Sequence, residues 1–168
     1  MNTYHFKLPR FLKLALIGVA SLFAGTAVQA QSDTFNVTAN VGDACSVSAT
    51  DLGFGAYDPL SATDTDASST MDVTCTLSTA YNVGLDAGTG TGATTTTRVM
   101  EDGSNQLNYI LSQNVGHTTN WGNNAGVDTV AGTGSGSAQS LTVYGRIAAL
   151  QSVPAGSYAD VITVTVTF

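Results

Sequence analysis

The residues from Tyr158 to Phe168 constrain the fold more than any other part of the chain. Ile162, Val164, Val166 and Phe168 alternate with threonine. Alternation with a period of two, built from β-branched residues, predicts a half-buried β-strand. Because no residue follows Phe168 in the sequence, we expect one of two arrangements. Either this strand pairs inside a complete sheet, or it borders an open edge that another chain must fill.

The first thirty residues are predicted to be a secretory signal peptide. Lys7, Arg10 and Lys13 form a basic start, residues 14–24 are mostly apolar, and residues 27–30 supply a cleavage site of small residues. The apolar run is shorter than the roughly 20 residues that a membrane-spanning helix needs. We therefore expect cleavage after residue 30 and export of a mature chain, residues 31–168, with the size of one domain.

The mature chain is strongly acidic. Its only basic residues are Arg98 and Arg146, whereas all twelve Asp and Glu residues remain, so the formal net charge is 2 − 12 = −10. Such a surface repels nucleic acids and anionic membranes, and neither partner is expected. The two arginines are expected to pair either with acidic neighbours or with a neighbouring subunit.

Short strand candidates, separated by glycine-rich and Asx-rich turns, fill the mature chain. They are residues 34–41, 44–49, 52–56, 70–77, 81–86, 98–101, 106–113, 140–150 and 159–168. The intervening loops are residues 58–69, 87–97 and 116–138, and no segment of helical length has a period of 3.6. Regularly spaced short strands without helices predict an all-β fold, a β-sandwich of the immunoglobulin type.

The two cysteines, Cys45 and Cys75, occupy inward positions of two alternating segments. In an exported protein a disulfide is favoured over a metal site or a catalytic thiol. A bridge across a loop of about thirty residues is expected to contribute roughly 3–4 kcal/mol on the chain-entropy model.

Residues 34–41 alternate as cleanly as the C-terminal strand. Phe35, Val37, Ala39 and Val41 lie on one face, and Thr and Asn residues lie on the other. Glycine at position 42 separates this segment from the strand that carries Cys45. The segment is therefore either an ordinary first strand or a tethered strand that reaches into a neighbour.

Other residues suggest binding sites but favour structural roles. His117 and Trp121 together resemble part of a sugar-binding surface, although packing is the favoured role for the tryptophan. A single histidine with no triad partners supports neither a metal site nor an enzyme. Asp58, Asp64 and Asp66 supply oxygen ligands that suit calcium, but they lack the EF-hand spacing, and a solvated acidic loop is favoured.

Several motifs occur in one order along the mature chain. They are Phe35-Asn-Val-Thr-Ala-Asn-Val41, Cys45-Ser-Val47, Leu52-Gly-Phe-Gly55, Val73-Thr-Cys75, Leu107-Asn-Tyr-Ile-Leu111, His117-Thr-Thr-Asn-Trp-Gly122, Leu141-Thr-Val-Tyr-Gly-Arg-Ile147 and Pro154-Ala-Gly-Ser-Tyr-Ala-Asp160. In this order, and behind a signal peptide, they resemble the pilins of the archaic chaperone–usher pathway. These are the spore coat protein U domain proteins of Csu-like pili.

The resemblance implies an immunoglobulin-like sandwich that lacks its final strand and is completed by a donor strand from a neighbouring subunit. It divides the chain into a signal peptide (1–30), a donor segment (31–42) and a pilin domain (43–168). The implied donor side chains are Phe35, Val37, Ala39 and Val41. The implied acceptor edge, which a chaperone occupies before assembly, consists of Ile162, Val164, Val166 and Phe168.

Two functions from different classes follow. The first is a structural subunit, most simply of the shaft, of a surface pilus of a Gram-negative bacterium for adhesion and biofilm formation. The implied partners are identical or related pilin subunits, a periplasmic chaperone and an outer-membrane usher, without a cofactor. The alternative is a secreted monomeric sandwich that binds carbohydrate, and it predicts that residues 34–41 pair within their own sheet.

Overall fold

Eight β-strands make up the regular structure of residues 28–168, the part of the chain that the computed structural model describes. They are β1 (Cys45–Ala49), β2 (Thr65–Cys75), β3 (Ala80–Leu85), β4 (Arg98–Asp102), β5 (Asn105–Ser112), β6 (Val130–Thr133), β7 (Gln139–Ile147) and β8 (Val164–Thr167). Residues 28–168 contain no helix, and therefore none with the length and apolarity to cross a membrane. The all-β prediction is confirmed.

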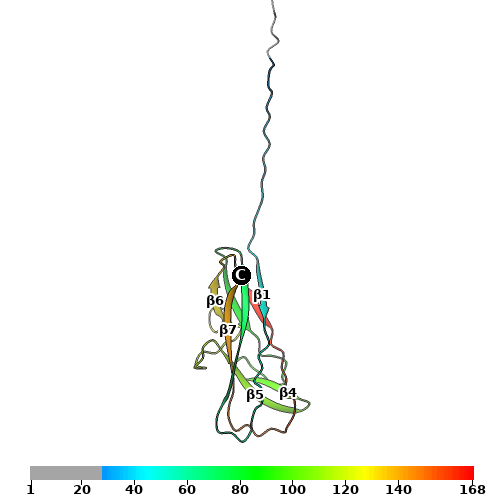
Figure 1. Cartoon of the computed structure of the whole chain (residues 1–168), viewed down its shortest axis with the longest axis vertical. Coiled ribbons are helices and arrows are strands. Elements are labelled where there is room, and N and C mark those ends of the chain that lie inside the picture. The colour runs from blue at the N-terminus through cyan, green and yellow to red at the C-terminus, as the bar shows by residue number, and fades with distance from the viewer. Residues whose placement is uncertain (1–27) are drawn as a thin grey trace, which may run out of the picture. The chain divides into compact units, whose positions relative to one another are not determined.

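The strands form two sheets with the core between them (Figure 1). One sheet has the order β1-β2-β7-β5-β4 and the other has the order β6-β3-β8, with antiparallel pairing throughout. Alternate residues of both sheets point inward, as a period of two requires. The innermost residues include Val73 of β2, Val83 of β3, Leu111 of β5 and Ile147 of β7. This arrangement confirms the predicted β-sandwich.

Trp121 lies inside the sandwich with 1% of its surface exposed. Its indole Nε1 donates a hydrogen bond of 2.9 Å to the carbonyl of Val83, so the polar end of the ring is satisfied. The packing role predicted for Trp121 is confirmed, and the ring offers no face to a sugar.

The disulfide between Cys45 and Cys75 joins residues that lie directly opposite each other in the β1–β2 ladder. The predicted bridge is therefore confirmed. It ties β1, an edge strand of five residues, to β2, a strand of eleven residues that pairs on both of its sides.

Within the sandwich, the structure differs from the predicted strands at residues 52–56 and at β6. Residues 52–56 form no strand, since Gly55 adopts a left-handed φ of 70° and the segment leaves the ladder that Ala49 ends. Strand β6 was missed because it lies in the glycine-rich stretch that was assigned to a loop. It pairs with β3 through Gly132, where an added Cβ would collide with the ring of Tyr81. Only glycine allows this approach.

Strand boundaries differ most at two places. β2 begins at Thr65, within the predicted loop, because the polar residues before Met71 pair with β7 along its whole length. The C-terminal strand is shorter than predicted, since β8 starts at Val164 rather than at residue 159. Hydrogen bonds from side chains, described below, hold the residues before it.

Two predictions concern the N-terminal part of the chain. Residues 1–27 of the predicted signal peptide lie outside the described residues. Residues 28–43 form no strand, and the predicted strand over 34–41 is absent. Residues up to Ala39 and residues from Asn40 to Phe168 form two separate units, and all eight strands belong to the second.

Candidate functional site

An apolar groove of about 530 Å³ opens between the two sheets at the edge of the sandwich. Its two rims are residues 49–54, which follow β1, and residues 158–164, which lead into β8. Core side chains form its floor, among them Leu85, Leu111 and Val143. A second hollow of about 540 Å³ adjoins it and shares Leu52, Phe54, Met100 and Tyr158. A folded domain that leaves core side chains open in this way has space for further apolar residues.

The rim on the β1 side carries unpaired backbone groups. Thr76 N–H donates to the carbonyl of Ala44, and Thr50 N–H donates to the carbonyl of Thr70, so residues 44 and 50 face β2. Because successive residues of a strand face opposite edges, Cys45, Val47 and Ala49 turn their N–H and C=O groups away from β2. No strand pairs with β1 on that side.

The C-terminal rim has the same property. The carbonyl of Thr163 accepts a hydrogen bond from Asp86 N–H, so Thr163 faces β3. By the same alternation Ile162, Val164 and Val166 face the other edge, where β8 has no neighbour in the ladder. A strand placed between the two rims would therefore meet free hydrogen-bonding groups on both of its sides.

The predicted acceptor residues divide into two pairs. Ile162 and Val164 line the groove. Val166 packs against the core but does not line the groove, and Phe168 is 57% exposed. Figure 1 shows β1 beside the red C-terminal strand, and these two strands are in contact. The groove is thus open beside residues 158–164 and closed where β8 approaches β1.

A backbone bridge between Ala159 and Glu101 of β4 and two carboxylates hold residues 159–163 in place. Asp160 accepts hydrogen bonds from Thr89 N–H (2.7 Å) and Thr89 Oγ1 (3.0 Å) and from the Tyr109 hydroxyl (2.7 Å). Asp86 accepts from Thr163 N–H at 2.9 Å. Sequence reasoning missed all of these contacts, because a carboxylate that binds a distant backbone amide follows no local pattern.

These contacts also shift the pKa values of their members. Burial raises the pKa of the Tyr109 hydroxyl, and the hydrogen bond to Asp160 raises it further. Burial alone would raise the pKa of Asp86, but hydrogen bonds from Thr163 and Gly88 outweigh it and hold the pKa below its usual value. The rim is therefore held most firmly while Asp86 is ionised.

Aromatic packing fixes the opposite rim. The rings of Phe54 and Tyr109 meet edge to face, with 5.9 Å between their centroids. A Cβ added at Gly145 of β7 would lie 2.8 Å from Phe54 Cζ, closer than packing allows. Gly145 thus makes space for the ring, which anchors residues 52–56 without a strand.

The apolar side chains predicted as donors are exposed. Phe35 is 86% exposed, Val37 is 84% exposed and Val41 is 85% exposed. Three large apolar side chains so close together in sequence and so exposed are unusual on a protein surface.

Arg146 lies among the aspartates that were weighed, and not favoured, as calcium ligands. Its guanidinium binds Asp66 through two hydrogen bonds, of 2.6 and 2.7 Å, and lies 3.2 Å from Asp64. The hydrogen bond from Arg146 lowers the pKa of Asp66, and Asp66 in turn raises that of Arg146. His117 Nε2 lies 3.5 Å from Asp66, while Asp58 accepts from Leu60 N–H. Among residues 28–168, no cluster of acidic, His or Cys side chains is arranged to hold a metal ion.

Arg98 is completely buried and contacts carbonyl groups instead of carboxylates. Its guanidinium donates to the carbonyls of Leu85, Asp86, Thr95 and Trp121. Burial lowers its pKa, and these four carbonyls replace the water that the cation has lost. Arg98 therefore joins the end of β3 to the start of β4. Of the two partners proposed for the arginines, acidic neighbours are observed for Arg146 only.

Comparison with known proteins finds a matching family model, a relative and a similar solved structure. The model of the Spore Coat Protein U domain family matches residues 31–165. Protein U of Myxococcus xanthus is 36% identical over 171 residues, which cover 92% of this chain and 95% of that protein. A similar solved structure is the CsuC–CsuE chaperone–tip adhesion subunit pre-assembly complex from the archaic chaperone-usher Csu pili of Acinetobacter baumannii. It aligns with a TM-score of 0.57 and 25% identity over 76% of this chain, which spans only 40% of the solved chain.

Proposed function

Because the chain belongs to the Spore Coat Protein U domain family, we propose that it is a structural subunit of a chaperone–usher surface pilus. In this proposal the subunits polymerise by donor-strand exchange, and the fibre serves adhesion and biofilm formation. The fold and the family are those of structural pilus subunits rather than of enzymes. The observation that carries the proposal is the apolar groove between two unpaired strand edges.

The groove and residues 33–41 complement each other chemically. The groove offers core side chains and two rows of free backbone groups, and the segment offers four apolar side chains on one face. Burying Phe35, Val37, Ala39 and Val41 would contribute on the order of 6–9 kcal/mol of apolar transfer free energy. Ladder hydrogen bonds would each add about 0.5–1.5 kcal/mol. The total is comparable with the whole stability of a small domain.

The open edge also explains the need for a chaperone. An exposed strand edge over an apolar groove is a site for aggregation, so a periplasmic chaperone is proposed to cover it until assembly. The solved neighbour is itself a complex of a chaperone with a pilus subunit, which supports this partner. Export through the periplasm, passage through an outer-membrane usher and display on the cell surface follow as parts of the same proposal.

Within the fibre, a shaft position is proposed. The chain combines one sandwich with its own donor segment, as a repeating unit requires. It matches less than half of the solved chain that contains a tip adhesion subunit. The alternative of a carbohydrate-binding monomer loses support, because residues 34–41 form no strand and Trp121 is buried.

Substitution of the two faces of the donor segment tests the proposal. The variant F35S/V37S/V41S is expected to abolish filaments under electron microscopy, because its apolar face cannot fill a groove. The matched control N36A/T38A/N40A changes the opposite face and is expected to keep them. Normal filaments from the first variant would refute the donor assignment.

Substitution in the groove tests the acceptor side. I162S/V164S is expected to lower filament yield, because both side chains line the groove. The control T165A, at an exposed position of the same strand, is expected to have no effect. Equal yields from the two variants would show that this edge is not the acceptor.

A further inference from the structure

The residues that join the donor segment to β1 carry a hairpin signal that the structure does not use. Gly42 and Asp43 stand between two alternating segments, and a Gly-Asp pair in this position predicts a two-residue β-hairpin turn. β1 has a free edge, and strands adjacent in sequence usually pair. The donor segment would then lie in the groove of its own domain. Yet residues 28–43 form no strand.

A two-residue turn has the wrong register. It would place Val41 opposite Ala44 and therefore Asn40 opposite Cys45, whose side chain faces the core. Every polar residue of the segment would point inward and every apolar one outward. The turn would also need the backbone groups of Ala44, but these already bind Thr76. Ala44 N–H donates to Thr76 Oγ1 at 3.0 Å, and the Ala44 carbonyl accepts from Thr76 N–H at 2.9 Å.

A turn of three residues restores the register. With Gly42, Asp43 and Ala44 in the loop, Val41 would lie opposite Cys45 and Val37 opposite Ala49, so the apolar face would point into the core. This self-pairing would satisfy the edge of β1 and fill part of the groove. It would, however, take Ala44 out of the ladder with β2 and into a turn conformation.

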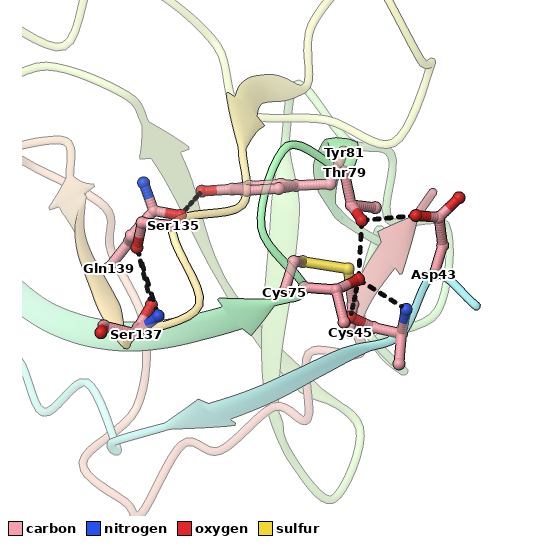
Figure 2. Close-up of a disulfide and its surroundings, with 10 residues drawn as sticks. Asp43, Cys45, Cys75, Thr79, Tyr81, Ser135, Ser137 and Gln139 are labelled. Atoms are coloured by element: carbon pink, nitrogen blue, oxygen red, sulfur yellow. Dashed lines mark hydrogen bonds between the residues drawn. A yellow bond between two sulfur atoms is a disulfide. The ribbon is translucent and has the colours of Figure 1, made fainter. Parts of the chain in front are cut away.

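Three side-chain contacts oppose that loop, and Figure 2 shows the one between Asp43 and Thr79. The hydroxyl of Thr79 donates to Asp43 Oδ1 at 2.7 Å, and the hydroxyls of Thr79 and Thr76 lie 2.7 Å apart. Thr76 Oγ1 accepts the bond from Ala44 N–H described above. The carboxylate of Asp43 and the backbone of Ala44 are thus both bound to one short turn between β2 and β3.

That turn is a firm anchor. Thr79 is buried, and its carbonyl accepts a hydrogen bond of 2.7 Å from Gly134 N–H. The carbonyl of Gly134 accepts from Ser78 N–H at 2.8 Å, and an added Cβ at Gly134 would lie 2.8 Å from Cys75 Cβ. The turn is therefore fixed by the loop that precedes β7 and lies next to the disulfide, and a bond to it holds Asp43 in place.

We propose that Asp43, Thr76 and Thr79 form a latch that prevents the chain from filling its own groove and so reserves the donor segment for a second copy. The inference rests on the proposed function and adds its regulation. The latch favours polymerisation because a self-paired subunit would offer neither a free donor nor a free groove.

The test measures whether a monomer uses its own donor segment. Three mature chains, namely wild type, T79V and T79S, are refolded without chaperone. Each is also prepared with the triple substitution F35S/V37S/V41S. Without the latch, the segment pairs with its own domain. The triple substitution should therefore lower the melting temperature of monomeric T79V by at least about 5 °C and leave that of wild type unchanged. T79S keeps the hydroxyl and should behave as wild type.

The oligomeric state gives a second measure. At a concentration at which wild type polymerises, T79V is expected to keep a severalfold larger monomer fraction in size-exclusion chromatography. A melting temperature of T79V that does not respond to the triple substitution would overturn the latch. If T79V does not fold, D43A replaces it, because this variant removes only the exposed carboxylate. The same response of the melting temperature to the triple substitution is then expected for D43A. Failure of the proposed function is distinct, since wild type would then form no filaments. Failure of the donor assignment would appear as filaments formed by the triple variant with an intact latch.

Discussion

The two ends of the space between β1 and the C-terminal segment are built in opposite ways. At the closed end, the Cys45–Cys75 disulfide and the Thr76–Thr79 turn fix the start of β1, and β8 lies against it. At the open end, residues 49–54 and 158–164 stand apart over exposed core side chains. Polar and covalent bonds hold the first end, whereas the second leaves apolar core side chains open. The open core side chains are therefore concentrated at one end of this space.

Filling the open end should produce the largest change. Residues 33–41, fused after Phe168 through a short Gly/Ser linker, should raise the free energy of unfolding by up to about 6–9 kcal/mol. Urea denaturation of the monomer measures the gain. The matched control is the same fusion with Ser at the copies of Phe35, Val37 and Val41, which should give little stabilisation. Equal gains from both fusions would mean that apolar filling is not what the open end lacks.

Removing the covalent bond at the closed end should have the next largest effect. C45S/C75S is expected to lose roughly 3–4 kcal/mol, because the bridge closes a loop with a sequence separation of 30 residues. Urea denaturation at neutral pH measures the loss. S46A, at the neighbouring outward position, is the control and should cost less than about 0.5 kcal/mol. If C45S/C75S were as stable as S46A, the closed end would not depend on its disulfide.

The closed end was easier to predict from the sequence than the open one. Cysteines in an exported chain indicate a disulfide directly, and alternation predicted strands where β2, β3, β5 and β7 lie. Two features of the open end had no such signal. Residues 52–56 look like a strand but leave the ladder at Gly55 and pack through Phe54 against Gly145. The rim residues 159–163 look like part of a strand but are held by contacts with Asp86, Thr89 and Tyr109, which are distant in sequence.

The role of residues 34–41 shows a second limit of the sequence. Their alternation predicts a strand correctly only if a partner is present, and in the single chain they form none. Periodicity reports which face would be buried but not against which molecule. The buried site of Arg98 could not be predicted from any sequence pattern, because its four carbonyl partners come from three separate segments.

Loosening the C-terminal rim should have a smaller effect than removing the disulfide. Y109F deletes the hydroxyl that binds Asp160 and is expected to cost about 1.5–3 kcal/mol, the usual value for a hydrogen bond to a charged group. Amide hydrogen exchange should accelerate at residues 159–163, because Asp160 then keeps only its bonds from Thr89 and Val161. Y144F, on β7, is the control. Unchanged exchange in Y109F would show that the rim does not depend on this contact.

The smallest expected effect is a pH dependence that is confined to the same rim. The pKa of Asp86 is lowered in the folded protein, so its contribution is fully present above the ordinary value of 3.8 and is lost as the pH falls through the lower folded value. D86N keeps an oxygen acceptor for Thr163 and Gly88 but carries no charge, so it should cost less than about 1 kcal/mol at pH 7. The stability difference between wild type and D86N should shrink as the pH falls from 5 to 3.

A second carboxylate separates this effect from general acid destabilisation. Asp66 also has a lowered pKa, but it binds Arg146 on β7, and neither of these two residues lines the groove. D66N should therefore change the acid dependence of global stability without faster amide exchange at residues 159–163, whereas D86N should change both. The same exchange pattern in the two variants would contradict the view that Asp86, unlike Asp66, holds the rim. That result would mean that the rim and the closed end open together as a single cooperative unit.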